Sequence, residues 1–163
     1  MEKHELVDIN GNTTGKILTH IEACDSNNVS SGYYIPVVGV VIINKNNEVL
    51  LQKRSRCKRA NPSKWGICGG KVDLGETSIE AGIRETFEEI GIRLNKEDLK
   101  FLSMDTNEKI HFTVYCVRKD VDVDECKLQE KELEEVRYFK IGELQDLDSE
   151  GFEWLENLKK VIK

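Results

Sequence analysis

The segment from Tyr34 to Ile43, with the sequence YIPVVGVVII, constrains the fold of this chain more than any other. It is almost continuously apolar and rich in valine and isoleucine, which is typical of a strand that is buried on both faces of a sheet. The chain has 163 residues, enough for one domain with a substantial hydrophobic core and too few for two full-sized domains. We therefore expect a single domain over residues 1–163, with an extension over 1–33, a core over 34–145 and a C-terminal helix over 146–163.

The rest of the chain predicts further strands around one well-defined helix. This helix should run from Thr77 to Ile90, with Gly91 as its C-terminal stop. Residues 1–33 are polar and rich in turns, with a tight turn at Asn10-Gly11. Together these elements predict an α+β fold. The other elements that we expect are strands over residues 48–53, 109–117 and 136–141, a turn over 44–47, and an amphipathic helix over 150–162.

Composition and charge argue against several classes of protein. No apolar run approaches the roughly 18 residues of a membrane-spanning helix, and the N-terminus lacks the apolar core of a secretion signal. The five cysteines are odd in number and form no C-x-x-C pair, which disfavours a disulfide framework or a zinc ribbon and favours a reduced, cytoplasmic setting. The net charge of −6 disfavours nucleic acid as a partner, provided that the charge is spread evenly. The segment Gly11–Lys16 resembles a phosphate-binding P-loop but has only three residues between its glycines, so we interpret it as a turn.

The predicted helix separates an apolar face from an acidic face. Its start, Thr77-Ser78-Ile79-Glu80, is a capping-box sequence. At about 100° per residue, four apolar side chains fall within an arc of about 80° that we expect to face the core, and three glutamates lie on the opposite side. Glutamates this close repel one another unless cations neutralise them, and hard ions such as Mg²⁺ and Mn²⁺ prefer oxygen ligands. The alternative is an acidic face that is merely solvated, the commoner outcome for glutamate-rich helices. The apolar residues are Ile79, Ile83, Phe87 and Ile90, and the glutamates are Glu85, Glu88 and Glu89.

A longer pattern runs through this helix: Gly70-x5-Glu76-x7-Arg84-Glu85-Thr86-Phe87-Glu88-Glu89-Ile90-Gly91-Ile92. It resembles the signature of the Nudix hydrolases, G-x5-E-x7-R-E-U-x-E-E-x-G-U, in which U is a bulky apolar residue. All seven fixed residues are present at the right spacing. Thr86 departs from the pattern, because an apolar residue is usual there, and we expect it to weaken packing more than chemistry. The resemblance implies an α/β/α sandwich with a mixed sheet and a central signature helix, and a hydrolase that cleaves a diphosphate linked to another group with Mg²⁺ or Mn²⁺.

The same resemblance implies roles for individual residues. Glu85, Glu88 and Glu89 would hold the metal ions, with the Gly69 carbonyl as a further ligand. Glu85 or a later glutamate would activate the attacking water, Arg84 would orient a carboxylate of the helix, and Glu76 would brace the loop or reach the metal. Members of the family often supply another glutamate from the loop before the late strand. The candidates here are Glu132 and Glu134, and a solvated charge run is the alternative interpretation.

A basic loop lies between the second predicted strand and the signature. Five of the seven residues from Lys53 to Arg59 are cationic. A solvated loop is one interpretation, and its position ahead of the signature favours a second, in which it steers or binds a polyphosphate. Nucleic-acid binding is a third interpretation, weakened by the net negative charge and by the lack of nearby aromatic residues. The candidates for substrate binding are Lys53, Arg54, Arg56, Lys58 and Arg59.

Segments outside the signature resemble a narrower branch, the Nudix proteins related to isopentenyl-diphosphate isomerase. These segments are Asp8–Asn12 with Thr14-Gly15-Lys16, then Leu50–Ser55, and Asn61-Pro62-x-x-Trp65. This second resemblance implies an isomerase as the alternative function. The isomerase's catalytic cysteine aligns with Gly69, so Cys68 is one residue out of register and its side chain should point the other way. Because this chain also has only three histidines, we interpret Cys68 as a packed residue and favour hydrolysis.

The sequence defines the substrate only as a class, a nucleoside diphosphate derivative or a related organic diphosphate. Some Nudix subgroups are marked by a proline or tyrosine about 15 to 18 residues beyond the signature. Residues 107–110 contain neither, which argues mildly against the ADP-ribose and diadenosine polyphosphate types. We expect a small-molecule partner and no membrane partner, and a homodimer is compatible with the sequence.

Overall fold

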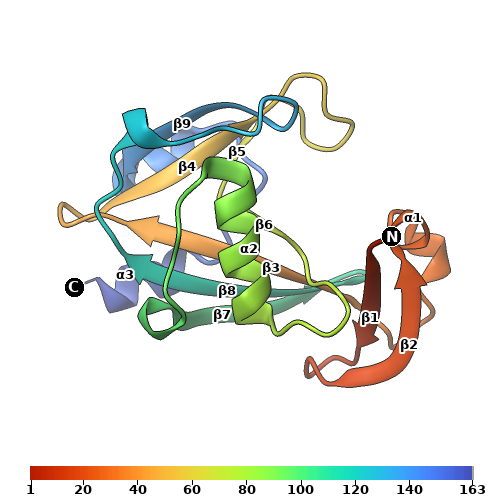
Figure 1. Cartoon of the computed structure of the whole chain (residues 1–163). Coiled ribbons are helices and arrows are strands. Elements are labelled where there is room, and N and C mark those ends of the chain that lie inside the picture. Colours follow the sequence, from red (N-terminus) through yellow and green to blue (C-terminus); the bar gives the residue numbers. More distant parts are fainter. Residues whose placement is uncertain (163) are drawn as a thin grey trace.

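The computed structural model describes residues 1–162, and the apolar segment after Tyr34 forms the centre of its main sheet (Figure 1). This central strand, β3 (Ile35–Ile43), pairs in parallel with β8 (Ile110–Arg118) along its full length. Its other edge is shared by two antiparallel partners. β6 (Cys68–Lys71) pairs with Val37–Val40, and β4 (Glu48–Arg54) pairs with Ile42 and Ile43. The strand is therefore enclosed by neighbours, as its composition predicts.

The remaining strands extend the sheet in both directions and make it mixed. On one side β4 pairs with β5 (Trp65–Gly66) and with β9 (Leu133–Lys140), both antiparallel. On the other side β7 (Lys100–Asn107) pairs with β8, also antiparallel. Short 3₁₀ turns occur at η2 (Lys96–Asp98), η3 (Val123–Glu125) and η4 (Ile141–Asp146).

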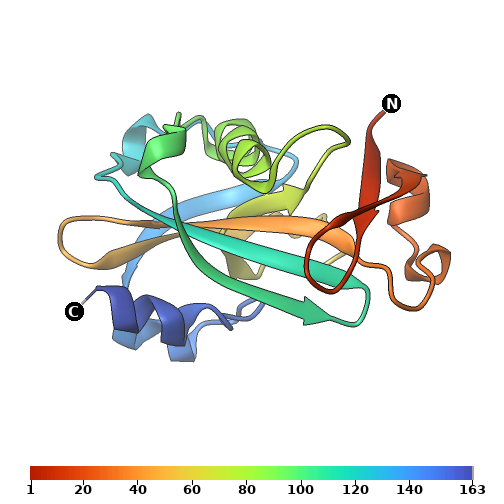
Figure 2. The same ribbon diagram turned by 90° about the horizontal axis from the view of Figure 1, so that it is seen from below.

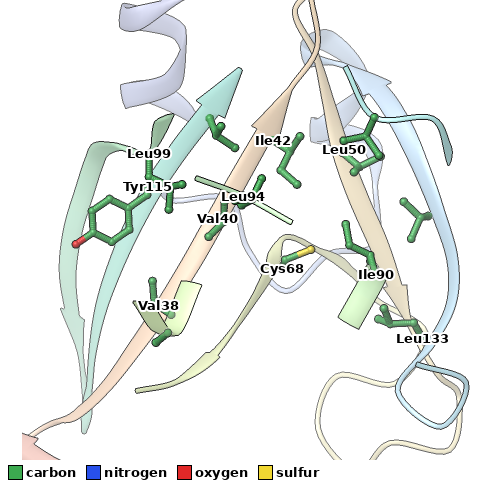
Figure 3. Close-up of a cluster of buried hydrophobic side chains, with 14 of the residues drawn as sticks. Val38, Val40, Ile42, Leu50, Cys68, Ile90, Leu94, Leu99, Tyr115 and Leu133 are labelled. Carbon is green, nitrogen blue, oxygen red and sulfur yellow. The ribbon is translucent and has the colours of Figure 1, made fainter. Parts of the chain in front are cut away.

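Helices cover both faces of this sheet, as Figure 2 shows from below. α2 (Ser78–Ile90) lies on one face and α3 (Leu155–Val161) on the other. Each helix closes a separate hydrophobic cluster. The cluster on the α2 side includes Val38, Val40, Cys68 and Ile90 (Figure 3), and the cluster on the α3 side includes Val41, Leu51, Trp154 and Leu158. The predicted α/β/α sandwich with a mixed sheet is confirmed.

The N-terminal region forms a small unit of its own at one end of the sandwich. β1 (Lys3–Val7) and β2 (Thr13–Thr19) make a two-stranded antiparallel sheet, followed by α1 (His20–Ala23) and η1 (Ser26–Asn28). The predicted turn joins the two strands, with Gly11 at φ 84°. A bridge between Val7 and Tyr34 links the unit to the start of β3. A third apolar cluster joins residues of this unit to the start of β3. Its members are Leu6, Leu18, Ala23, Val29 and Ile35.

The face that α2 turns toward the sheet differs from the apolar stripe expected from the sequence. Phe87 is 42% exposed, and Cζ of Arg93 lies over its ring, 4.3 Å from the ring centroid. Gly82 and Thr86, in contrast, are buried. Gly82 explains the difference, because a Cβ there would lie only 2.9 Å from Cγ2 of Val40, so the helix approaches β3 along its small residues. Thr86 does not disturb the packing, since its hydroxyl donates to the Gly82 carbonyl at 2.8 Å.

Most predicted elements are present, but β1, β2, β5 and β6 lie outside the expected strands, and the terminal helix begins later than expected. The strands expected at 34–43, 48–53, 109–117 and 136–141 and the helix at 77–90 correspond to β3, β4, β8, β9 and α2. β7 was not among the expected strands either. The terminal helix begins at Leu155 and not at Glu150, because the preceding residues follow β5: Ser149 bridges Trp65, and the Glu150 N–H donates to the Trp65 carbonyl at 3.0 Å. Among the described residues, no helix is long and apolar enough to cross a membrane.

Candidate functional site

The ends of α2 are fixed by local hydrogen bonds, which sets the direction of its glutamates. The Thr77 hydroxyl accepts a hydrogen bond from the Glu80 N–H at 3.2 Å, and the Glu80 carboxylate accepts one from the Thr77 N–H at 2.8 Å. This is the capping box predicted from the sequence. At the other end Gly91 takes the left-handed conformation, with φ 76°. The helix therefore presents its carboxylates from a frame that begins and ends where the sequence predicts.

Arg84 lies at the centre of a network of ion pairs on this helix. Its Nε and Nη2 contact both carboxylate oxygens of Glu76, at 3.1 and 2.5 Å. Its Nη1 contacts Oε1 of Glu85 at 2.9 Å and Oε2 of Glu88 at 3.3 Å. Burial opposes ionisation of Glu76, but hydrogen bonds from Arg84 and from the Asp73 N–H outweigh it and lower the pKa of this carboxyl group. Arg84 therefore joins the loop before α2 to two of the helix glutamates.

Glu89 is buried and Glu85 is partly buried, with a side chain 18% exposed, and both lie against the glycine pair of β6. Oε1 of Glu89 accepts a hydrogen bond from the Gly69 N–H at 2.8 Å, and its other oxygen accepts one from the Gln52 amide. A Cβ at Gly70 would overlap the Glu85 carboxylate, so any side chain there would have to displace this carboxylate. Burial raises the pKa of Glu85 to about 7, against the opposing effect of Arg84. Burial also raises the pKa of Glu89 to about 8, despite its two hydrogen bonds.

The third helix glutamate is in a different environment. The side chain of Glu88 is 51% exposed and pairs with Arg84 in the i, i+4 geometry of a helix. The structure thus brings Glu76, Arg84, Glu85, Glu88, Glu89 and Gly69, all predicted site residues, to one region between α2 and β6. The side-chain atoms that could bind a metal ion in this set are all carboxylate oxygens, the ligand type that Mg²⁺ and Mn²⁺ prefer.

A cleft of about 610 Å³ opens beside this region. Gly69, Gly70 and Glu89 form part of its wall, together with Gln52. Apolar side chains also line it, so the cleft combines a charged end with surfaces that suit a less polar group. The lining of the cleft also includes Arg54, Ile67, Phe112, Glu150 and Trp154.

Glu150 is a site residue that the sequence did not indicate. Its Oε1 lies 3.2 Å from Nε of Arg54, and a side chain at Gly66 would occupy the space that its carboxylate fills. Burial raises the pKa of Glu150, although Arg54 opposes this effect. The Glu150 charge in turn contributes to the raised pKa of Glu89. Its sequence neighbourhood is an ordinary acidic run, so no local pattern identifies it.

Two cations of the basic loop are paired with glutamates at the start of β9. Nε of Arg56 lies 3.0 Å from Oε1 of Glu134, and Lys58 forms an ion pair with Glu132. The two glutamates proposed from the sequence as extra metal ligands are therefore partners of the basic loop and do not line the cleft in the described part of the chain. Of the five predicted substrate-binding cations, Arg54 lines the cleft. Lys53 lies over the Trp65 ring at 6.0 Å, and Arg59 is exposed.

Cys68 is packed in the core, as the sequence analysis predicts. It is 5% exposed, belongs to the cluster beneath α2 (Figure 3), and its thiol donates to Oε1 of Gln52 at 3.2 Å. Burial raises the pKa of the Cys68 thiol well above its usual value, with the charge of Glu89 adding to the effect. The thiol is therefore a packed residue of this cluster, in agreement with its place one residue out of register with the isomerase's cysteine.

Comparison with known proteins agrees with this geometry. The NUDIX domain model matches residues 33–158. An uncharacterised Nudix hydrolase of Listeria monocytogenes is 31% identical over 152 residues, which cover 93% of this chain and 87% of that protein. An RNA pyrophosphohydrolase of Yersinia enterocolitica is 39% identical over 74 residues, which cover 45% of this chain and 38% of that protein. The crystal structure of DR0079 from Deinococcus radiodurans has the same fold, with a TM-score of 0.74 and 19% identity over 99% of this chain and all of that one.

The family match spans the sandwich and includes the whole of the helix, the glycine pair and the cleft described above. The N-terminal unit, from β1 to η1, lies before the matched region. The chain belongs to the Nudix hydrolase family and is a pyrophosphohydrolase of that family.

Proposed function

We propose that this protein hydrolyses the diphosphate linkage of a nucleoside diphosphate derivative or a related organic diphosphate, using Mg²⁺ or Mn²⁺. One observation carries the proposal: Glu89, buried against Gly69, lines the wall of a 610 Å³ cleft, and the partly buried Glu85 lies beside it against Gly70. Placing two carboxylates there is costly for the folded chain, because burial disfavours their charged forms. A divalent cation would offset that cost.

The donor set fits such a cation. Glu85, Glu88 and Glu89 would hold it, with the Gly69 carbonyl as a further oxygen ligand. When bound, Mg²⁺ or Mn²⁺ would neutralise charge on the diphosphate and lower the pKa of a coordinated water. The absence of a side chain at Gly70 lets the Glu85 carboxylate lie close to the backbone of β6.

The chain's own residues would position the reacting groups. Arg84, through its bonds to Glu76 and Glu85, holds the helix carboxylates in place. Glu85 would accept the proton of the attacking water, since Arg84 holds its carboxylate beside the glycines of β6. Arg54, at the cleft, would contact a phosphate of the substrate.

We further propose that Glu150 is the additional carboxylate of the site. It lines the cleft with Glu89 and Arg54, whereas Glu132 and Glu134 are paired with Lys58 and Arg56. The group attached to the diphosphate would lie on the apolar side of the cleft, against Ile67 and Phe112. These side chains suit a base or another group with an apolar face and do not select one.

The test is a substrate panel with purified full-length protein. We expect Mg²⁺-dependent release of product from at least one nucleoside diphosphate derivative or organic diphosphate. Glu85→Gln should reduce kcat by about 10²-fold or more, the usual range for loss of a catalytic acid or base. Glu97→Gln, a substitution at an exposed carboxylate of η2, is the matched control. Turnover that persists after complete chelation of divalent ions, or no turnover across a broad panel, would contradict the proposal.

A further inference from the structure

Two histidines and a glutamate meet in the N-terminal unit, away from the signature helix. The pairing of β1 with β2 brings Lys3 opposite Thr19, and the His20 N–H donates to the Glu2 carbonyl at 2.9 Å. This register places the side chains of Glu2, His4 and His20 together. His4 Nε2 is 3.0 Å from His20 Nδ1, which is 3.4 Å from Glu2 Oε2. One ligand atom from each residue lies within 4.8 Å of the other two.

Hydrogen bonding fixes which nitrogen of His4 faces this cluster as an acceptor. His4 is 1% exposed, and its Nδ1 lies 2.8 Å from the Val72 carbonyl. A carbonyl oxygen only accepts, so Nδ1 carries the proton, and in the neutral ring the lone pair is on Nε2. That lone pair points at His20 Nδ1, as does the carboxylate of Glu2. A single proton on His20 Nδ1 would have to serve both acceptors.

We propose that Glu2, His4 and His20 form a Zn²⁺ site, with the metal ion in place of that shared proton. Imidazole nitrogen and carboxylate oxygen are ordinary zinc ligands, and three protein ligands leave a fourth position for water. Two nitrogens bound tetrahedrally at about 2.1 Å lie about 3.4 Å apart, so the ring nitrogens need to separate by only a few tenths of an ångström. The bond from His4 Nδ1 to the Val72 carbonyl is the kind of outer contact that holds metal-binding histidines in one orientation.

The donors distinguish this site from the carboxylates of α2. Imidazole ligands favour zinc and other transition metals, whereas a set made only of oxygens favours Mg²⁺ and Mn²⁺. One protein would thus hold two kinds of metal at two places. The zinc site also connects to the loop that leads into α2, because His4 contacts Val72, Asp73 Oδ1 lies 3.6 Å from His4 Nδ1, and the Leu74 N–H donates to the Lys3 carbonyl at 2.8 Å. Bound zinc would fasten the N-terminal unit to that loop.

The histidine rings themselves provide the test. Full-length, isotope-labelled protein is saturated with Mg²⁺ and titrated with ZnCl₂, and proton–nitrogen correlations of the imidazole rings are recorded. We expect the ring signals of His4 and His20 to move, with saturation at one equivalent, and those of His111 to stay in place. His111 is buried on β8, outside the cluster, and serves as an internal control. Zinc that binds only at the α2 carboxylates would leave the rings of His4 and His20 unchanged.

Variants separate binding from folding. His20 is 44% exposed, so His20→Asn should leave the fold intact, as backbone amide spectra will show. The substitution should weaken zinc binding by at least tenfold. Loss of an outer-shell contact already weakens metal binding by about 10- to 100-fold, and loss of a ligand should cost no less. Glu2→Gln should also weaken binding, and Glu97→Gln is its matched control. The proposal is overturned if the His4 and His20 signals do not respond to one equivalent of zinc, or if folded His20→Asn binds it as tightly as the original protein.

Discussion

At the scale of single residues, glutamates that lie close together on one helix have different surroundings. Glu89 is buried, Glu85 is partly buried and Glu88 is half exposed, although all three lie within five consecutive residues. The cause is the approach of β6, whose glycines contact Glu85 and Glu89 but not Glu88. Residue identity therefore indicates which groups can act, and burial raises the pKa of Glu85 and Glu89.

Glu150 and Glu134 form a matched pair for testing the additional carboxylate. Glu150→Gln removes a charge that lines the cleft, and we expect kcat to fall at least tenfold, since positioned acids and bases contribute about 10²–10⁴-fold. Glu134→Gln removes a charge paired with Arg56 outside the cleft and should leave kcat within about twofold, because exposed ion pairs contribute little. Steady-state kinetics with Mg²⁺ decide the matter. The reverse order of effects would show that Glu134, and not Glu150, is the additional carboxylate of the site.

The sequence predicts the residues of the signature because they are local. Thr77 to Gly91 contain their own cap, stop and charge spacing, and each forms as expected. Glu150 and Gln52 are not predicted, because they reach the site only through the pairing of β4, β5 and residues 148–150. Glu132 and Glu134 show the converse. They are close to the site along the chain, but ion pairs with the basic loop hold them outside the cleft.

At the scale of elements, the two glycines of β6 have separate functions. A Cβ at Gly69 would overlap the Val38 carbonyl of β3, and backbone cannot move aside easily. A Cβ at Gly70 would instead overlap the movable carboxylate of Glu85. We expect Gly69→Ala to lower stability by about 1–3 kcal/mol. Gly70→Ala should keep its stability and lose about 10- to 100-fold in kcat/KM, because displacing a catalytic group by about 1 Å has effects of this size. Chemical denaturation and kinetics on both variants measure this contrast, and equal losses of stability would contradict it.

The approach of α2 to β3 gives a prediction in which two effects compete. Alanine is favoured over glycine within a helix by up to about 1 kcal/mol. Against this, a Cβ at Gly82 would lie 2.9 Å from Cγ2 of Val40, and overpacking a core costs about 1–3 kcal/mol. Because valine is stiff, we expect the crowding to prevail and Gly82→Ala to lower the free energy of unfolding. A variant more stable than the original protein would show that the helix can move away from β3 without cost.

Elements were predicted from the sequence wherever a run of residues contains its own pattern. β3 is an example, since nine apolar or small residues need no distant partner to be recognised. β7 was missed because most of it is exposed and a bulge between Phe101 and Ser103 interrupts its alternation. The face of α2 was assigned by hydrophobicity, and Phe87 was misplaced because Gly82, with no side chain at all, forms the closest contact with the sheet.

At the scale of the whole molecule, the net charge of −6 conceals a separation of charges. Arg56 and Lys58 are paired with glutamates at the edge of the molecule, so their charges cancel locally. The carboxylates of α2 and Glu150 gather near the cleft, where Arg84 and Arg54 contact them. An acidic protein can therefore act on an anionic substrate, provided that divalent cations are bound where its own carboxylates gather.

This arrangement makes the stability of the metal-free protein depend on pH in an unusual direction. In the unfolded chain the glutamates titrate near pH 4.5, whereas burial raises the pKa of Glu85 to about 7 and of Glu89 to about 8. From pH 7 to 8.5 the folded protein thus holds protons that the unfolded chain has lost, so raising the pH favours unfolding. The lowered pKa of His111 acts in the opposite sense, but its contribution is small because an imidazole titrates mainly below pH 7 even in the unfolded chain. The two shifts together predict a loss of about 1.5 kcal/mol over this range, most of it from Glu89.

Thermal unfolding at pH 7 and pH 8.5 in the presence of a chelator measures this loss. We expect Tm to fall by about 3–6 °C, the change that corresponds to about 1.5 kcal/mol for a chain of this size. Glu89→Gln should remove most of the fall, and Glu97→Gln should not. Saturating Mg²⁺ should raise Tm more at pH 8.5 than at pH 7, because the ion binds the ionised carboxylates of the folded state and at pH 7 must first displace their protons. A metal-free Tm that rises between these two pH values would mean that Glu85 and Glu89 are already ionised at neutral pH, and that burial alone does not create the demand for a cation at this site.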